Sequence, residues 1–313
     1  MNRFTPSPAI DVHQHVWTPP LIAALRARSE PPRLRGWVLE LPGQPPFPVR
    51  AADHDIGLRR QAQTGDGLDL AVVSLSSALG LERLPARDCQ PLLDAYHAGV
   101  SELGPSFRAW ASACLAPIDA AALEHLLQLG FVGLELPADA LLDAEDYERV
   151  GPLLDVLEAA GRPLFIHPGP AAGPRGAPAW WAPVLAYPQQ MHAAWLAFGL
   201  HGRPRHRELK VCFALLAGLA PLHAERSRAR GGPGSPHDPH VFVEISSYGP
   251  RAIDAIVRAL GVDALVNGSD RPYAEPACTG LGPAAEFAIR TTNPIRLLDL
   301  EEVSVELALA SSA

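Results

Sequence analysis

The sequence predicts a single (β/α)8 TIM barrel. Short apolar runs alternate with helical patterns along most of the 313 residues, which is typical of βα units around a parallel sheet. Eight runs and eight helical patterns can be counted, the number that closes such a barrel. A doubly wound open sheet would instead need a glycine-rich turn after its first strand, where this chain carries two histidines. We therefore expect residues 1–313 to form one domain.

The predicted strands share a composition of β-branched and apolar residues, and they are 9–15, 68–76, 107–114, 131–136, 163–167, 209–215, 240–246 and 263–267. The predicted helices fill the gaps, near 50–64, 88–103, 119–130, 145–160, 188–202, 218–230, 249–260 and 283–310. Helix boundaries are marked locally: 119–130 begins with Asp119, a good N-cap, and ends on Gly130. The segment 145–160 is followed by Gly161, which also terminates a helix well.

Three connections are longer than a barrel needs. Residues 29–49 follow strand 1 and residues 168–187 follow strand 5, so both leave the strand ends where barrel enzymes place their sites. Their aromatic residues suggest a cap or lid over a pocket, with packing against the barrel rim as the alternative; they are Trp37, Trp180, Trp181 and Tyr187. Residues 227–239 would open on the opposite face, where we expect no function.

Composition excludes several classes of protein. The net charge is −8 and no Lys/Arg cluster is present, which argues against nucleic-acid binding. No apolar stretch is long enough to span a membrane, and residues 1–9 do not resemble a signal peptide, so a cytoplasmic protein is expected. The four cysteines are far apart and are expected to be buried thiols in a reducing compartment; they are Cys89, Cys114, Cys212 and Cys278.

Two histidines stand at the end of the first predicted strand. His13 and His15 are two residues apart, so both point to the same face of the strand, which is the barrel interior. Two inward imidazoles can bind one metal ion, although such a pair can also be purely structural. Asp11 precedes them on the same strand.

His167 and Asp270 are expected at the same rim. His167 ends strand 5, where it would be a ligand or polarise a substrate carbonyl. Asp270 follows strand 8, which neighbours strand 1 in a closed barrel, so its carboxylate is expected beside the two histidines. A carboxylate next to a metal-bound water is a natural general base. The alternative for Asp270 is a helix cap or an Asx turn.

Five segments in this order resemble the amidohydrolase superfamily, and they are DVHQHVW, GFVGLELP, PLFIHPG, LKVCFALLAGLAP and VNGSDRPY. The chain is most similar to the amidohydrolase-related branch, which holds aminocarboxymuconate semialdehyde decarboxylase and aromatic-acid decarboxylases beside many hydrolases. The resemblance runs from Ile10 to about Leu298. The combination of HxH at strand 1 with GSDxP at strand 8 is specific, whereas either alone is not.

The resemblance implies a single metal held by His13, His15, His167 and Asp270. The metal of this family is usually zinc, and such a ligand set also suits manganese or iron. In the family pattern Asp270 takes or returns a proton, so it is expected to be catalytic. His167 would hold or polarise the substrate.

One position departs from the family. A histidine usually ends strand 6, in a pattern like LKxxxAHxGG, and here Leu215 occupies that place while Ala217 replaces the first glycine. The loss removes an acid–base group and makes that corner of the site apolar. Strand 4 ends in Glu135 rather than a lysine that could be carboxylated, so at most one metal is expected. Glu135 could itself be a ligand.

Substrate contacts are expected around the rim, from residues whose alternative role is packing or loop bridging; they are Trp17, Trp181, His192, Ser246, Tyr248 and Arg271. Trp17 would stack on a planar substrate, and Arg271 would pair with a carboxylate. The remaining histidines are expected on solvated faces; they are His54, His97, His125, His201, His206, His223, His237 and His240.

Three functions fit these observations. The preferred one is a metal-dependent hydrolase of a small ester, lactone or amide, because it needs only an activated water and Asp270. The alternative is a non-oxidative decarboxylase of an aromatic or muconate-like acid, which would have lost one proton donor at Leu215. A metal-free or non-catalytic barrel that binds a small molecule is the third. In each case the partner is a small molecule, and a homo-oligomer is possible.

Overall fold

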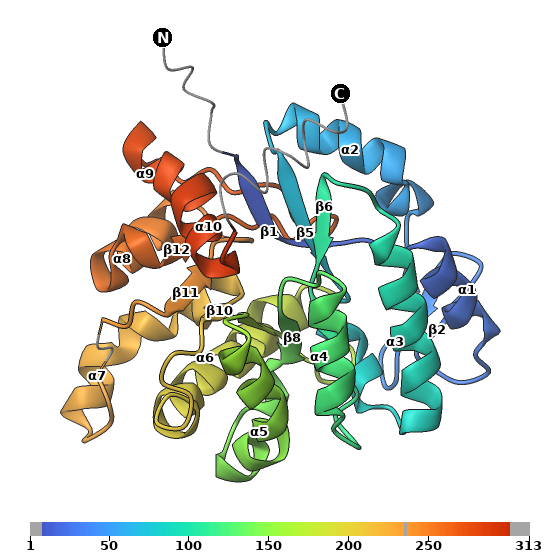
Figure 1. Cartoon of the computed structure of the whole chain (residues 1–313), viewed down its shortest axis with the longest axis horizontal. Helices are drawn as coiled ribbons and strands as arrows, with labels where there is room; N and C mark the ends of the chain where they lie inside the picture. Colours follow the sequence, from blue (N-terminus) through green and yellow to red (C-terminus); the bar gives the residue numbers. More distant parts are fainter. Residues whose placement is uncertain (1–7, 235–236, 301–313) are drawn as a thin grey trace.

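A computed structural model describes residues 8–234 and 237–300. Within these residues, parallel strands form the centre of the molecule and helices surround them (Figure 1). The barrel strands are β1 (Ile10–His15), β5 (Leu70–Ser74), β6 (Phe107–Ala109), β7 (Ala111–Ser112), β8 (Leu134–Pro137), β9 (Leu164–His167), β10 (Val211–Phe213), β11 (Val241–Glu244) and β12 (Leu265–Val266). The third barrel position is shared by β6 and β7, which Trp110 separates.

Neighbouring strands pair in parallel in the order in which they occur in the sequence. One sheet has the order β1-β5-β6 and the other β12-β11-β10-β9-β8-β7. Main-chain hydrogen bonds close the barrel between its ends: the Val12 N–H donates to Asn267 O at 2.9 Å and the His15 N–H to Arg271 O at 2.7 Å. The predicted barrel is therefore confirmed, with every predicted strand present in the described residues.

Helices cover the outside of the barrel, and they are α1 (Pro19–Ala27), α2 (Ile56–Gly65), α3 (Ala86–Ser101), α4 (Ala120–Gln128), α5 (Ala144–Ala159), α6 (Tyr187–Ala197), α7 (Ala224–Ala229), α8 (Pro250–Leu260), α9 (Pro283–Phe287) and α10 (Asn293–Leu298). Local chemistry starts several of them. The side chains of Asp55, Asp119 and Asp143 each accept N–H groups at the first turn of α2, α4 and α5. The predicted helix 283–310 is broken into α9, a π-helical turn and α10, and residues 301–310 of it lie outside the described residues.

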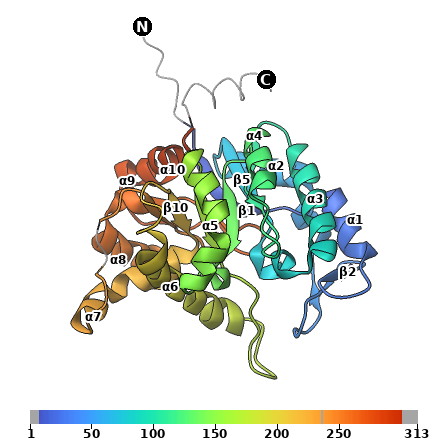
Figure 2. The same ribbon diagram turned by 60° about the horizontal axis from the view of Figure 1, so that its bottom comes forward.

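The two long connections are partly ordered. Residues 29–49 contain an antiparallel sheet of β2 (Arg33–Arg35), β3 (Val38–Glu40) and β4 (Phe47–Pro48). Helix α1, which the sequence analysis did not predict, precedes this sheet. The connection after β9 projects from the barrel (Figure 2) and ends in a π-helical turn, Ala182–Ala186, that leads into α6. No helix among the described residues is long and apolar enough to cross a membrane.

The cysteine prediction is wrong for three of the four residues. Cys89 on α3 and Cys114 beyond β7 form a disulfide, with their Cα atoms 6.2 Å apart. Cys278 is exposed, and Cys212 is the free thiol that is buried as expected. Spacing along the chain could not reveal the pair, because the 24 residues between the two cysteines include most of α3 and the strands β6 and β7, whose fold brings the cysteines together. The argument for a reducing compartment rested on free thiols and loses this support.

Candidate metal centre

Strand β1 carries two of the four predicted ligands into the barrel. All six of its residues are buried, and the side chains of His13 and His15 have no exposed surface. Because strand residues alternate in direction, both imidazoles point inward, and their Nε2 atoms lie 3.0 Å apart. The period-two spacing seen in the sequence thus produces a pair of adjacent nitrogens.

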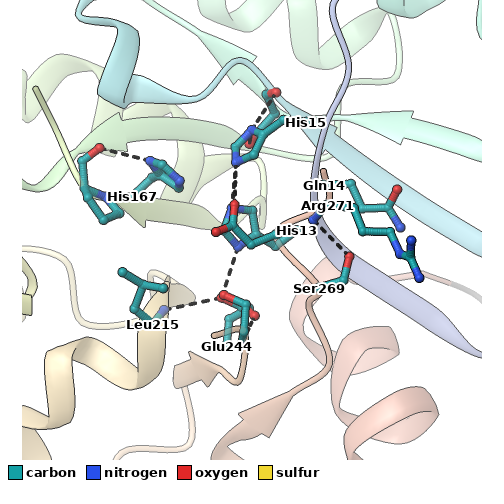
Figure 3. A network of polar contacts seen from close by, with 12 residues as sticks. His13, Gln14, His15, His167, Leu215, Glu244, Ser269 and Arg271 are labelled. Atoms are coloured by element: carbon teal, nitrogen blue, oxygen red, sulfur yellow. Dashed lines mark hydrogen bonds and ion pairs between the residues drawn. The ribbon is translucent and has the colours of Figure 1, made fainter. Parts of the chain in front are cut away.

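Asp270 and His167 complete the group, and Figure 3 shows His167 on the same side as His13 and His15. The Asp270 Oδ1 atom lies 3.1 Å from His15 Nε2 and 3.5 Å from His13 Nε2. The imidazole of His167, at the end of β9, has its ring centroid 5.1 Å from the ring centroids of both other histidines. One ligand atom from each of the four residues falls within 4.8 Å of the others. The structure therefore brings together every residue predicted as a ligand.

The second nitrogen of each histidine has a partner that orients the ring. His13 Nδ1 lies 3.0 Å from Glu244 Oε2, His15 Nδ1 lies 3.1 Å from Ser74 O, and His167 Nδ1 lies 3.0 Å from Pro168 O. Each of these oxygens can accept a hydrogen bond from Nδ1, and the Ser74 hydroxyl also lies 3.1 Å from His15 Nδ1. In its neutral form, a ring whose proton is on Nδ1 turns the lone pair of Nε2 toward the cluster.

The chemistry of the donor set fits a divalent cation. Two imidazole lone pairs and a carboxylate oxygen face one another at 3.0–3.5 Å, and acceptors at this distance repel unless a proton or a metal lies between them. Three histidines and one aspartate are ligands that zinc, manganese and iron all accept. We conclude that the residues present can hold one such ion.

The electrostatics of the three histidines differ. Burial tends to lower the pKa of His13, but the carboxylates of Glu244 and Asp270 outweigh this and raise its pKa to about 9. Burial lowers the pKa of His15, against a hydrogen bond to Asp270. Burial and the two neighbouring histidines lower the pKa of His167 well below its ordinary value. His15 and His167 are thus kept neutral, which is the form that binds metal.

The backbone at Asp270 is unusual. Its φ is 59°, in the left-handed region that residues other than glycine rarely adopt. The Asp270 N–H donates to His13 O at 2.8 Å, which fixes the loop after β12 against β1. The Asp270 side chain is 16% exposed, whereas those of His13 and His15 are fully buried. Among the four candidate ligands, Asp270 is therefore the best placed to meet an entering substrate.

Two predicted substrate contacts serve the interior instead. Trp17 is fully buried and stacks on His54, with ring centroids 4.6 Å apart and planes 7° from parallel. Its indole fills the core, so it is not free to stack on a substrate, and His54 is buried rather than solvated. Ser246 is also fully buried, and its hydroxyl donates to Glu244 Oε2 at 2.8 Å.

The other predicted contacts lie around the rim. The guanidinium of Arg271 pairs with Asp66 at 3.0 Å and Glu275 at 2.9 Å, so it bridges loops. In further pairs, Trp181 lies against Trp180, and His192 against His223, and Tyr248 is half-buried. Substrate contacts from Trp181, His192 and Tyr248 stay predictions.

Two tyrosines belong to the site more clearly. The ring of Tyr273 lies 5.5 Å from the ring of His15, and the residue is 46% exposed, so it extends from the candidate ligands to solvent. Burial raises the pKa of the Tyr187 phenol, and the nearby charge of Asp270 adds to this shift. The sequence analysis placed Tyr187 in the lid but overlooked Tyr273, although it stands three residues after Asp270.

The corner that lacks the family histidine is closed by backbone contacts. Leu215 follows β10 directly, is 7% exposed and lies beside Glu244 (Figure 3). Its N–H donates to Glu244 Oε2 at 3.3 Å. Glu135, considered as a ligand, accepts the N–H groups of Leu75 and Ser77 at 3.0 and 3.1 Å, so both of its oxygens are already engaged.

Solved structures with the same architecture were found, although no protein-family model and no curated protein matches the sequence. IDCase of Metarhizium anisopliae superposes with a TM-score of 0.79 at 20% identity, covering 94% of this chain and 98% of that chain. The 5-carboxyvanillate decarboxylase LigW of Sphingomonas paucimobilis superposes with a TM-score of 0.71 at 16% identity, covering 95% of this chain and 100% of that chain. An amidohydrolase II structure superposes with a TM-score of 0.70 at 18% identity, covering 93% of this chain and 100% of that chain. The chain shares the barrel fold of these structures. A 2,6-dihydroxybenzoate decarboxylase of Rhizobium shares this barrel, with a TM-score of 0.68 at 17% identity over 94% of this chain and 99% of that chain.

The comparison corrects the preferred functional prediction. The sequence analysis favoured a hydrolase, whereas most of these similar structures are decarboxylases. The hydrolase prediction was wrong because a set of metal ligands with a carboxylate beside it can serve both reactions. The ligand residues alone therefore do not separate them.

Proposed function

We propose that this chain is a non-oxidative decarboxylase of an aromatic carboxylic acid that uses one divalent metal. The group of His13, His15, His167 and Asp270 supports the metal requirement, and the likeness to decarboxylases supports the choice of reaction. Decarboxylases of 5-carboxyvanillate and 2,6-dihydroxybenzoate share the barrel. A phenolic acid is therefore the first substrate class to test.

The reaction replaces a carboxylate on a ring carbon by a proton. The bond between the ring carbon and the carboxyl carbon breaks, carbon dioxide leaves, and the electron pair stays on the ring carbon until a proton arrives. A divalent cation, when bound, polarises a coordinating substrate oxygen and stabilises negative charge that develops on it. His13, His15 and His167 would hold this ion together with Asp270.

Asp270 is the group we assign to the proton transfer. Its Oδ1 faces His13 and His15, and the partly exposed carboxyl can meet the ring carbon of a substrate. Leu215 contributes no second proton donor and makes the adjacent corner apolar, which limits water there. The aromatic side chain of Tyr273 suits a planar ring.

Release of carbon dioxide from a panel of hydroxybenzoates and carboxyvanillates tests the proposal. The full chain is loaded with manganese or with zinc, because a 5-carboxyvanillate decarboxylase structure of Novosphingobium aromaticivorans contains manganese. Asp270→Asn is expected to lower kcat by roughly 10²–10⁴-fold, the usual contribution of a general acid or base. An unchanged kcat would remove Asp270 from the mechanism. Turnover of aryl esters without any decarboxylation would refute the function itself.

A further inference from the structure

Glu244 ends strand β11 inside the barrel, with no exposed surface. Its Oε2 accepts three hydrogen bonds, from His13 Nδ1 at 3.0 Å, Leu215 N at 3.3 Å and Ser246 Oγ at 2.8 Å. Its Oε1 accepts the N–H of Ser246. Donors from β1, from the turn after β10 and from the end of β11 thus converge on one carboxylate (Figure 3).

This contact distinguishes His13 from the other two histidines. The Nδ1 atoms of His15 and His167 lie against main-chain carbonyl oxygens, which carry no net charge. Among the described residues, His13 is the one of the three with a carboxylate at hydrogen-bond distance from Nδ1, at 3.0 Å, whereas Glu135 Oε1 lies 3.7 Å from His167 Nδ1. A carboxylate partner fixes the ring orientation and makes the opposite nitrogen a stronger donor to a metal than a carbonyl partner does.

The surrounding backbone is shaped to receive Glu244. A Cβ atom on Gly268, two residues after the end of β12, would lie 2.4 Å from both Cγ and Oε1 of Glu244, so only glycine fits there. Leu215 has a φ of 53°, and the left-handed conformation continues through Leu219 with a φ of 64°. Such a run is rare for residues other than glycine, and here it directs the Leu215 N–H toward the carboxylate.

We infer that Glu244 is a positioning residue for the metal centre: its carboxylate holds the His13 imidazole with Nε2 toward the ion. The left-handed turn that begins at Leu215 in turn holds Glu244 in place. The inference rests on the proposed function in that it assumes a metal at this site. It adds a residue and a turn whose effect is on metal affinity rather than on the chemical step.

Metal binding by the full chain tests the inference without reference to activity. Manganese and zinc affinities are measured by competition with a chelating dye for the wild type, for Glu244→Gln and for the control Glu82→Gln. Glu82 is also fully buried and accepts the Ser77 hydroxyl at 2.6 Å, but it contacts none of the candidate ligands. We expect Glu244→Gln to weaken metal binding 10–100-fold and Glu82→Gln to change it less than twofold.

Unfolding midpoints of the metal-free proteins separate positioning from general damage. The inference is supported if Glu244→Gln and Glu82→Gln have similar unfolding midpoints and only Glu244→Gln binds metal more weakly. If Glu244→Gln does not fold, Glu244→Asp, which keeps the charge but shortens the reach to His13, is expected to weaken binding as well. Wild-type affinity in a folded Glu244 variant overturns the inference alone. A wild-type chain that binds neither metal overturns the proposed function together with it.

Discussion

His97 on α3 offers a test of how burial controls stability. Its Nε2 accepts the N–H of Ser112 at 3.1 Å, and its ring meets Phe131 edge-on at 5.1 Å. Burial lowers the pKa of His97 from 6.5 to about 4. The unfolded chain therefore binds a proton between these two pH values while the folded chain does not. The contribution to stability is complete above pH 6.5 and is lost as the pH falls toward 4.

The magnitude follows from the shift of 6.5 to about 4, which corresponds to about 3 kcal/mol of unfolding free energy. Urea unfolding at pH 7 and at pH 4 measures it. His97→Gln keeps an acceptor near the Nε2 position and cannot be protonated. From pH 7 to pH 4, the unfolding free energy of the variant should therefore fall by about 3 kcal/mol less than that of the wild type. His125→Gln on the exposed side of α4 is the control. Equal pH dependence of the wild type and His97→Gln would refute the reasoning.

Three further changes have expected outcomes. Gly133→Ala places a Cβ 2.1 Å from Pro163 O, so overpacking of the barrel should lower the unfolding free energy, measured in urea, by about 1–3 kcal/mol or more. An unchanged unfolding free energy would mean that the chain before β8 and the chain before β9 separate freely. Replacement of Cys89 and Cys114, 25 residues apart, by serine should cost about 3 kcal/mol by the loop-entropy model, whereas reducing agent should leave the unfolding midpoint of that double variant unaltered. Leu215→His should add an ionisation near pH 6–7 to the kcat profile of decarboxylation, and an unaltered profile would show that side chain 215 does not face the reacting groups.

The barrel could be predicted because its signals are local. Each strand is a short apolar run, and helices such as α4 begin at an aspartate whose side chain caps the first turn. Elements without such signals were missed. Helix α1 starts at Pro19, with three residues between it and the end of β1, and the pairing of β2 with β3 and of β3 with β4 lies in a proline-rich connection that looked irregular.

The same distinction holds for the site. The sequence analysis could name His13 and His15 because their spacing of two determines a shared face of a strand. Trp17 was expected to meet substrate by the same rule, but its indole stacks on His54 from a distant segment. For Arg271, pairing with a substrate carboxylate and bridging of loops were both open, and its guanidinium pairs with Asp66, 205 residues away in the sequence, and with Glu275. Contacts between distant segments decided both outcomes.

The sequence by itself determined the barrel, the strand ends at which ligands stand and the absence of a strand-6 histidine at Leu215. These features depend on periodicity, on capping chemistry and on residue identity, all of which are written along the chain. Only the tertiary structure showed that Glu244 contacts His13, that Gly268 leaves space for Glu244 and that Cys89 bonds to Cys114. Each of these is a contact between residues far apart in the sequence, and such contacts exist only once the strands have closed into a barrel.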